Sequence, residues 1–317
     1  MALSKILPAS RDQSVDAANL ILNGAMAIAQ RGTSHTLSAG TGSYTLDRVR
    51  SQSNGGGITV SQETNTISGI QTEKMCRYTG ASGVTGVYYV YRVESKDAVQ
   101  LNGNSATFSI YIENNSGASI SPTIDYYHPT AIDNFSGLTT IASGVALGTI
   151  ADGASARLTA TTDLSGTTIT NGLMFQVNFG SALTSGTIDF TGVCLNVGDQ
   201  APANYPHRSY GEELALCQRY YQQWGPSSSE AHLRAFAGSY TTGVYISNHF
   251  LWPTIMRAYP SFAIPSGPTY QNSASFGIGS ISTTGVTLYS VSTGTNLIAG
   301  FYIDNNNSDY AYADAEL

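Results

Sequence analysis

Alternating apolar and polar residues fill most of the chain between Tyr44 and Val197. In 107–112 and again in 173–179 every second side chain is apolar, so each run has one face for a core and one for water. A period of two is typical of half-buried strands. Residues that tolerate positive φ separate the runs, at 54–57, 102–103, 114–117, 152–153 and 171–172. The pattern predicts an all-β fold of short antiparallel strands, as in a sandwich or barrel.

Two stretches depart from this pattern. Apolar residues in 20–27 are spaced as in a helix and predict a short arm or helix at the start of the chain. Ser209 and Glu212 match a capping box, which predicts a helix that begins at Tyr210 and ends at a Gly-Pro pair after residue 224. The apolar side of this helix would contain Leu214, Cys217, Tyr220, Tyr221 and Trp224. We interpret 209–224 as the boundary between two β domains.

The region that follows is nearly without charge. Between Gly225 and Ile303 the charged residues are Glu230, Arg234 and Arg257, three in 79 residues. Strand-like runs continue through it, so 225–317 is predicted to be a smaller β-sandwich. A domain of this size with so few charges is poorly protected against association. We therefore expect much of its surface to be buried against copies of itself.

Composition excludes several classes of protein. Charged residues make up 11% of the 317, and 38 Ser with 34 Thr supply the polar surface instead. A net charge of −7 without a basic cluster argues against nucleic acid or an anionic membrane as the main partner. The N-terminus lacks the apolar run of a secretory signal, and no run is long enough to span a membrane. Cys76, Cys194 and Cys217 fit neither a disulfide framework nor a zinc site, so we predict buried thiols in a protein made in a reducing cytoplasm.

The sequence motifs give little support to a catalytic function. The sequence contains no nucleophile elbow, no dinucleotide fingerprint and no metal-ligand spacing of histidines. We predict no catalytic residue, no metal site and no cofactor. Sugar binding requires fewer groups than catalysis does, because an aromatic face with polar groups beside it is enough. Candidate ligand contacts are Asp125, Tyr126, Tyr127, His128, Trp252 and Tyr259. Because neighbouring side chains of a strand point to opposite faces, one of the paired tyrosines must instead belong to the core.

Several segments resemble a module of tailed-bacteriophage fibre and virion-surface proteins. They are Asn19–Thr33, Tyr44–Arg48, Tyr89–Glu94, Thr107–Tyr111 and Arg208–Tyr221. That module is similar to carbohydrate-binding β-jelly-rolls, and the stretch from Pro253 to Leu317 resembles the β-sandwich that commonly follows it. The resemblance implies a jelly-roll over 19–208, a linker helix over 209–224 and a C-terminal trimerisation domain over 225–317. The first 18 residues have no strand pattern, so we expect them to be a docking arm for another virion protein.

The resemblance also implies a function. We expect a non-enzymatic virion structural protein on the phage surface, made in the host cytoplasm, that binds a host-surface glycan as a trimeric fibre or spike. The trimer would form through the C-terminal domain and through Leu214, Cys217, Tyr220, Tyr221 and Trp224. A capsid decoration, cement or head-fibre protein is the alternative, because few residues precede the module where a long fibre would carry a shaft. A glycan-cleaving tailspike enzyme is the second alternative.

Overall fold

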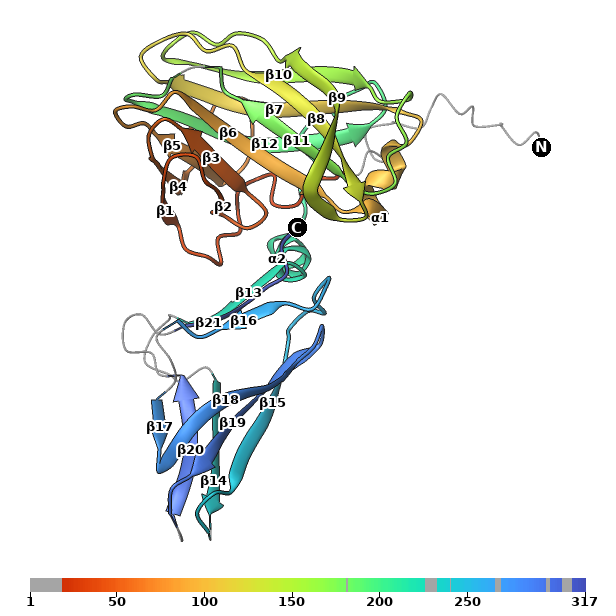
Figure 1. Cartoon of the computed structure of the whole chain (residues 1–317). Helices are drawn as coiled ribbons and strands as arrows, with labels where there is room; N and C mark the ends of the chain where they lie inside the picture. The colour runs from red at the N-terminus through yellow and green to blue at the C-terminus, as the bar shows by residue number, and fades with distance from the viewer. Residues whose placement is uncertain are drawn as a thin grey trace, which may run out of the picture. The chain divides into compact units, whose positions relative to one another are not determined.

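The computed structural model describes residues 19–180, 182–225, 233–239, 241–265, 269–294, 297–303 and 310–317. The chain divides into two compact units (Figure 1). The first ends at Tyr210 and also includes Leu317, and the second covers Gly211–Glu316. Every strand pairing found among the described residues is antiparallel. The predicted docking arm, residues 1–18, lies outside the described residues.

The first unit is a jelly-roll sandwich of two six-stranded sheets. In spatial order, one sheet consists of β1 (Ser34–Leu37), β4 (Ile58–Thr64), β5 (Lys74–Thr79), β12 (Thr187–Val197), β7 (Ser105–Asn115) and β10 (Ala154–Asp163). The other consists of β2 (Gly42–Tyr44), β3 (Arg50–Asn54), β6 (Gly86–Val93), β11 (Leu173–Asn178), β8 (Thr123–Ala131) and β9 (Asn134–Ala146). We call them the β12 sheet and the β6 sheet. A helical turn, α1 (Ser95–Ala98) with η3 (Val99–Leu101), follows β6. The all-β prediction is confirmed.

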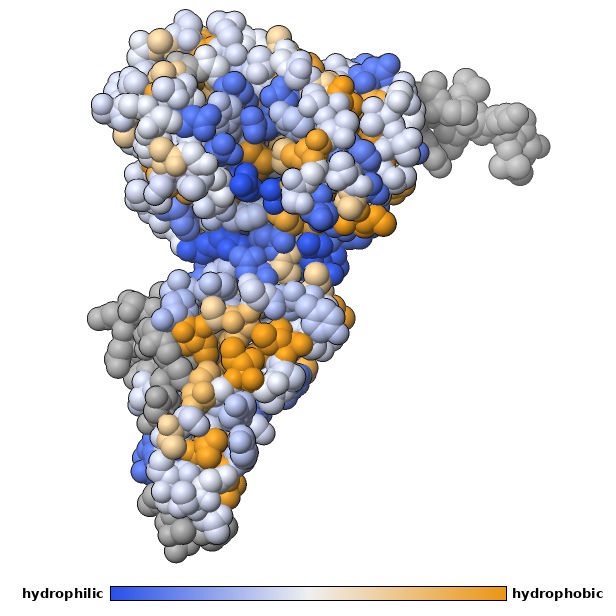
Figure 2. All heavy atoms as spheres, in the orientation of Figure 1, coloured by the Kyte–Doolittle hydropathy of each residue, from blue (hydrophilic) through white to orange (hydrophobic). Residues whose placement is uncertain are grey.

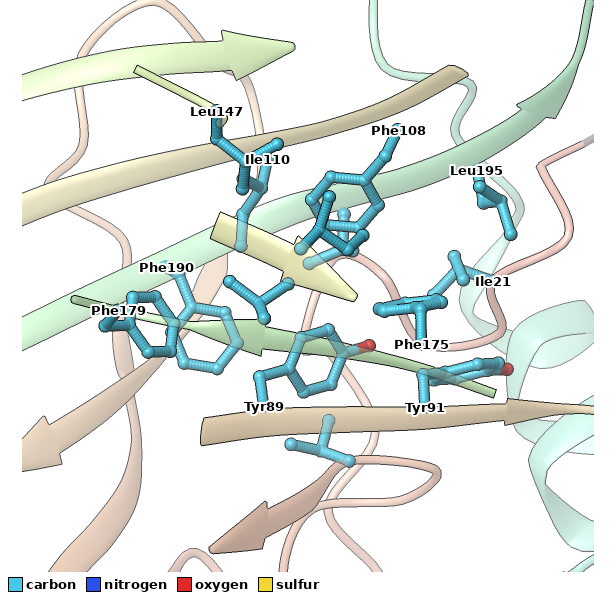
Figure 3. Packing of buried hydrophobic residues seen from close by; sticks show 14 of the residues in the cluster. Ile21, Tyr89, Tyr91, Phe108, Ile110, Leu147, Phe175, Phe179, Phe190 and Leu195 are labelled. Carbon is cyan, nitrogen blue, oxygen red and sulfur yellow. The ribbon is translucent and has the colours of Figure 1, made fainter. Parts of the chain in front are cut away.

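Aromatic rings from both sheets meet in the core (Figure 3). Phe175 of β11 stacks on Tyr91 with ring centroids 5.7 Å apart, and it meets Tyr89 edge-on at the same separation. Phe190, from the β12 sheet, lies 5.3 Å from Tyr89. These contacts join the two sheets and fix which alternate residues of β6 and β11 point inward.

Tyr126 belongs to this core, so its predicted role as a ligand contact is wrong. Its ring is fully buried, 6.5 Å from the ring of Phe175. Burial raises the pKa of Tyr126, which keeps its phenol protonated. The neighbouring Tyr127 points to the other side of the strand, where it is half-buried.

The segment 20–27, predicted as a short arm or helix, forms a turn. Asn23 and Met26 have left-handed φ angles of 57° and 58°, which a helix does not accept. Asn23 holds this geometry because its side-chain amide donates to the carbonyl of Asp47 at 2.8 Å. Asn19 accepts a hydrogen bond from the amide of Leu195 at 3.0 Å. These two buried asparagines attach the turn to the sandwich, where the sequence pattern indicated only apolar spacing.

The second unit contains a helix and three three-stranded sheets. Two sheets pack around Phe301 as the predicted sandwich. The third sheet joins the same buried cluster through Trp224, Phe262 and Ala313. One sheet of the sandwich consists of β14 (Leu233–Ser239), β20 (Leu297–Ile303) and β17 (Thr269–Gln271). The other consists of β15 (Tyr245–Leu251), β19 (Gly285–Ser292) and β18 (Ser273–Ile281). The third consists of β13 (Tyr221–Trp224), β21 (Ala311–Asp314) and β16 (Ser261–Ala263).

The predicted helix begins at Tyr210 as expected but is shorter than expected. Helix α2 covers Tyr210–Gln218, and the chain then continues as strand β13 over Tyr221–Trp224. The cause is tertiary, because β13 pairs along its whole length with β21, whose partner residues are 87 to 93 positions later in the sequence. Such pairing overrides a local helical pattern. None of the described helices has the length and apolar composition needed to cross a membrane.

One buried ion pair lies on the β12 sheet. The Asp189 carboxylate is fully buried and accepts two hydrogen bonds of 2.8 Å from the half-buried Arg77. Burial raises the pKa of Asp189, and Arg77 opposes that shift; the same hydrogen bond raises the pKa of Arg77. A buried carboxylate that loses its partner is strongly destabilising.

We expect Arg77→Met to lower the free energy of unfolding by about 3 kcal/mol at pH 7. The folded-state pKa of Asp189 lies above its unfolded value, so the cost of the unpaired carboxylate grows as the pH rises through that folded pKa. The loss should therefore be smaller at pH 4 than at pH 7 in urea unfolding. Lys74→Met, on the same strand and without an ion pair in the described residues, is the matched control. An equal loss at both pH values would contradict the account.

The core position of Tyr126 gives a second prediction. Tyr126→Ala should lower the free energy of unfolding by about 3 kcal/mol or more, because it leaves a cavity among packed rings. Tyr127→Ala, one position away on the same strand, should cost about 1 kcal/mol. Equal effects in denaturant unfolding would show that the two rings are not divided between core and surface.

Candidate functional site

The outward side of the β6 sheet presents an ordered array of polar and aromatic side chains. Alternation places the core residues of β6 and β11 on one side, so their other residues share the opposite side. We call this side the outer face. It is formed by Arg50, Gln52, Asn54, Tyr88, Val90, Arg92, Met174, Gln176, Asn178, Thr123, Asp125 and Tyr127.

The strand register brings these residues together in rows. Across one row, Gln52 lies opposite Tyr88, Tyr88 opposite Asn178, and Asn178 opposite Thr123. Gln176 lies opposite Asp125 in the next row. Residues directly opposite in a sheet have Cβ atoms roughly 5 Å apart. One row therefore crosses four strands, β3, β6, β11 and β8, with amides on both sides of the Tyr88 ring.

Two tyrosine rings stand over an apolar floor. Val90, Phe135 and Met174 form a small buried cluster, and Tyr88 and Tyr127 pack against it while remaining half-buried. Figure 2 shows hydrophilic residues gathered around apolar ones in the middle of the first unit. The rings are thus held in place from below and retain exposed surface above.

Hydrogen bonds orient both rings. The side-chain amide of Asn54 donates to the Tyr88 hydroxyl at 3.2 Å. The Tyr127 hydroxyl lies 3.5 Å from a carboxylate oxygen of Asp125, whose other oxygen accepts the amide of Gly144 at 2.6 Å. Partial burial, and then the Asp125 charge, raise the pKa of Tyr127. Its phenol therefore stays protonated at neutral pH and can both donate and accept hydrogen bonds.

Two arginines and Leu317 border this surface. Arg92 lies over the ring of Phe135, 5.2 Å from its centroid, and donates to the carbonyl of Leu317. The Tyr44 hydroxyl donates to the same carbonyl at 3.2 Å. Burial, and then the nearby Arg92, lower the pKa of Arg50. Leu317 also packs against the apolar floor.

This arrangement suits a neutral, hydroxylated ligand. Aromatic rings stack on the apolar side of a sugar ring, while amides and hydroxyls serve its hydroxyl groups. Among the residues that the described strands β2, β3, β6, β8, β9 and β11 present here, Asp125 is the one carboxylate. Glycoside hydrolysis commonly requires two carboxyl groups. The outer face has the groups that sugar binding uses.

Of the six predicted ligand contacts, two lie on the outer face, Asp125 and Tyr127. His128 is half-buried, with Nδ1 3.4 Å from the carbonyl of Gly172. Trp252 is wrong as a ligand contact, because its ring is buried against Trp224 and its Nε1 donates to the carbonyl of Ser282 at 2.8 Å.

Tyr259 is exposed but belongs to the second unit. The predicted ligand contacts therefore do not form one site. Sequence reasoning also missed Gln52, Tyr88, Gln176 and Asn178. Their alternation with core residues was visible, but the order of strands that joins them was not.

The predicted interface residues on the helix need a similar correction. Cys217, Tyr220 and Tyr221 are buried within their own chain, which removes them as subunit contacts. Trp224 is partly buried and packs against the core of the second unit. Leu214 is partly exposed.

The three cysteines are free, buried thiols, as predicted. Burial raises the pKa of Cys76 and raises that of Cys194 to about 12, so both remain protonated at neutral pH. Within the described ranges, no three His, Cys, Asp or Glu side chains are grouped closely enough to hold a metal ion.

Comparison with known proteins gives similarity in structure without similarity in sequence. The chain matches no protein-family model and no curated protein sequence. The enzymatically active domain of tailspike protein 4 from bacteriophage CBA120 is similar at 9% identity and a TM-score of 0.39, over 56% of this chain and 21% of that domain.

Two other solved structures are similar over nearly their whole length. One is the CBM22-1 xylan-binding domain of Xyn10C from Paenibacillus barcinonensis, at 12% identity and a TM-score of 0.33, over 58% of this chain and 97% of that domain. The other is a putative sugar binding protein from Bacteroides thetaiotaomicron, at 13% identity and a TM-score of 0.34, over 57% of this chain and all of that protein. The structural neighbours thus include a phage tailspike domain and carbohydrate-binding modules.

Proposed function

We propose that this chain is a non-catalytic bacteriophage virion protein, a trimeric fibre or spike whose outer face binds a glycan on the host surface. The observation that carries the proposal is the pair of tyrosine rings, Tyr88 and Tyr127, held over an apolar floor with amide side chains beside them. The motifs that resemble phage surface proteins supply the biological setting. The single carboxylate of this surface, Asp125, supports a binding role rather than a hydrolytic one.

The composition of the second unit supports self-association. From Leu233 to Ile303 the sequence has two charged residues, Arg234 and Arg257, and no carboxylate. Large apolar side chains are nevertheless exposed there, among them Tyr245 at 69%, Leu251 at 70% and Ile298 at 65%. Figure 2 shows broad apolar areas on the visible side of this unit. Apolar surface of this extent marks an interaction site in a soluble protein.

A trimer would also strengthen weak glycan binding. A shallow, open surface that recognises a neutral sugar through stacking and a few hydrogen bonds gives modest affinity per site. Three copies in one fibre or spike raise the overall strength of glycan binding without any new contact between protein and glycan. Because stacking depends little on ionic strength, adsorption should not require low salt.

The binding role is tested by substitution on the outer face. Tyr88→Ala and Tyr127→Ala should each weaken binding of the purified chain to host surface polysaccharide about tenfold, since a stacked ring contributes about 1 kcal/mol beyond its buried area. Binding should change little between low and physiological salt. Tyr210→Ala, which removes a tyrosine that is 64% exposed and does not lie on the β6 sheet, is the matched control.

Full binding by both outer-face variants would contradict the proposal. So would a wild-type chain that ignores host cells while particles lacking it lose capsid stability, which is the outcome expected of a decoration or cement protein.

Self-association is tested by solution mass. Light scattering should give three times the chain mass of 33.4 kDa. Leu251→Lys and Ile298→Lys should shift the protein toward monomer, because a charge in a close apolar contact is costly. Ile132→Lys, at 69% exposure in the first unit, should leave the mass unchanged. A monomeric wild-type chain at micromolar concentration would refute the trimer.

A further inference from the structure

The first unit carries a separate pocket on its other sheet. It lies between the β4–β5 loop and the segment that precedes α2, with a volume of about 220 Å³. Its lining residues are Gly69, Ile70, Gln71, Tyr111, Asn204, Tyr205 and His207. Tyr111 stands on β7 of the β12 sheet, so the pocket shares no residue with the outer face of the β6 sheet.

The floor of the pocket depends on a bulge in β12. The pairing of β12 with β7 shifts between Thr191 and Cys194, and Gly192 within the bulge has a left-handed φ of 62°. A Cβ atom at Gly192 would come within 2.1 Å of the Ile70 side chain and 3.0 Å of the Tyr111 ring. Because Gly192 has no Cβ atom, the side chains of Ile70 and Tyr111 can pack directly over β12.

Hydrogen bonds hold both walls in place before any ligand arrives. In the loop wall, Asn65 donates from its side chain to the carbonyl of Thr72 at 3.1 Å and accepts the amide of Ile67 at 2.9 Å. In the other wall, Arg157 donates to the carbonyls of Pro202 at 2.6 Å and Ala203 at 3.2 Å. A pocket that is already formed does not lose ordering entropy on binding.

Arg157 also joins that wall to the floor, because its guanidinium lies over the Tyr111 ring, 5.6 Å from the centroid. Tyr205 is buried and meets the His207 ring edge-on at 5.0 Å. Two tyrosine rings are thus fixed around the same small space.

The chemistry of the lining selects a class of ligand. Tyr111 and Tyr205 each expose 8% of their surface, which leaves a small part of each ring at the pocket wall, and no Lys, Arg, Asp or Glu side chain lines the pocket. The side-chain amides of Gln71 and Asn204 are exposed and have no hydrogen-bond partner among the described residues. The volume is below the range of about 300–1,000 Å³ that is usual for sites of larger ligands.

We propose that this pocket binds one neutral sugar residue, independently of the glycan-binding surface on the opposite sheet. The tyrosine rings would contact the apolar side of the sugar, and the amides of Gln71 and Asn204 would bind its hydroxyl groups. The jelly-roll would then have two saccharide sites, an extended one for a chain and a small one for a single residue.

The test uses small neutral ligands that are too short to benefit from the extended surface. Methyl glycosides of glucose, galactose, mannose and N-acetylglucosamine are titrated into the full chain and followed by saturation-transfer NMR. At least one should bind with millimolar affinity. Gln71→Ala and Asn204→Ala should each weaken that binding about fivefold, as expected for the loss of one hydrogen bond. Asn104→Ala, an exposed amide elsewhere in the first unit, is the matched control.

The outcomes separate this inference from the proposed function. Glycoside binding that survives in Tyr88→Ala and falls in the two pocket variants supports the second site, even if polysaccharide binding by the outer face fails. Binding that is lost in Tyr88→Ala and unchanged in the pocket variants would assign it to the outer face and overturn the inference. Absence of binding by all four glycosides would overturn it as well.

Discussion

The contact on which the site depends is the packing of aromatic rings between the two sheets of the jelly-roll. Phe175 stacks on Tyr91 and meets Tyr89, and Phe190 from the opposite sheet closes on Tyr89 (Figure 3). A shift of one residue in β6 would turn Tyr89 and Tyr91 to water and Tyr88 to the core. The core therefore decides which residues form the outer face.

The strand register that the core fixes also explains how a surface with few charged residues can select a particular ligand. Most polar residues of the outer face carry amides or hydroxyls, and three others, Arg50, Arg92 and Asp125, are charged. All of them stand on paired strands, so their spacing is fixed by the sheet and not by flexible loops. Side chains held on rigid elements lose less entropy when they bind. Arg50 and Arg92 lie on the same face, beside the rings and amides that a neutral ligand would contact.

Much of the fold was predictable from local pattern, and the failures have physical causes. Alternation in 107–112 and 173–179 identified strands, and Ser209 with Glu212 located the start of α2. The predicted end of that helix was wrong, because residues 221–224 form β13 and pair with β21 near the end of the chain. The turn near Asn23 was missed because buried side-chain hydrogen bonds, rather than periodicity, determine it.

The candidate site was less predictable than the fold. The alternation rule showed that one of Tyr126 and Tyr127 must be buried, but the sequence could not show which one until the core was known. Tyr88 and Gln176 are separated by almost 90 residues, and only the order of strands in the sheet makes them part of one surface. Local sequence composition does not show which strands, far apart in the chain, lie next to each other in the sheet.

The central claim is that the outer face binds glycan through its tyrosine rings, and fluorine NMR of the chain labelled with 3-fluorotyrosine tests it most directly. Signals are assigned by single Tyr→Phe substitutions, and fragments of host surface polysaccharide are then added. The account predicts that the resonances of Tyr88 and Tyr127 shift with increasing ligand while the buried Tyr89 and Tyr126 change least. Shifts confined to tyrosines of the second unit, or no shift at Tyr88 and Tyr127 at saturating ligand, would contradict it.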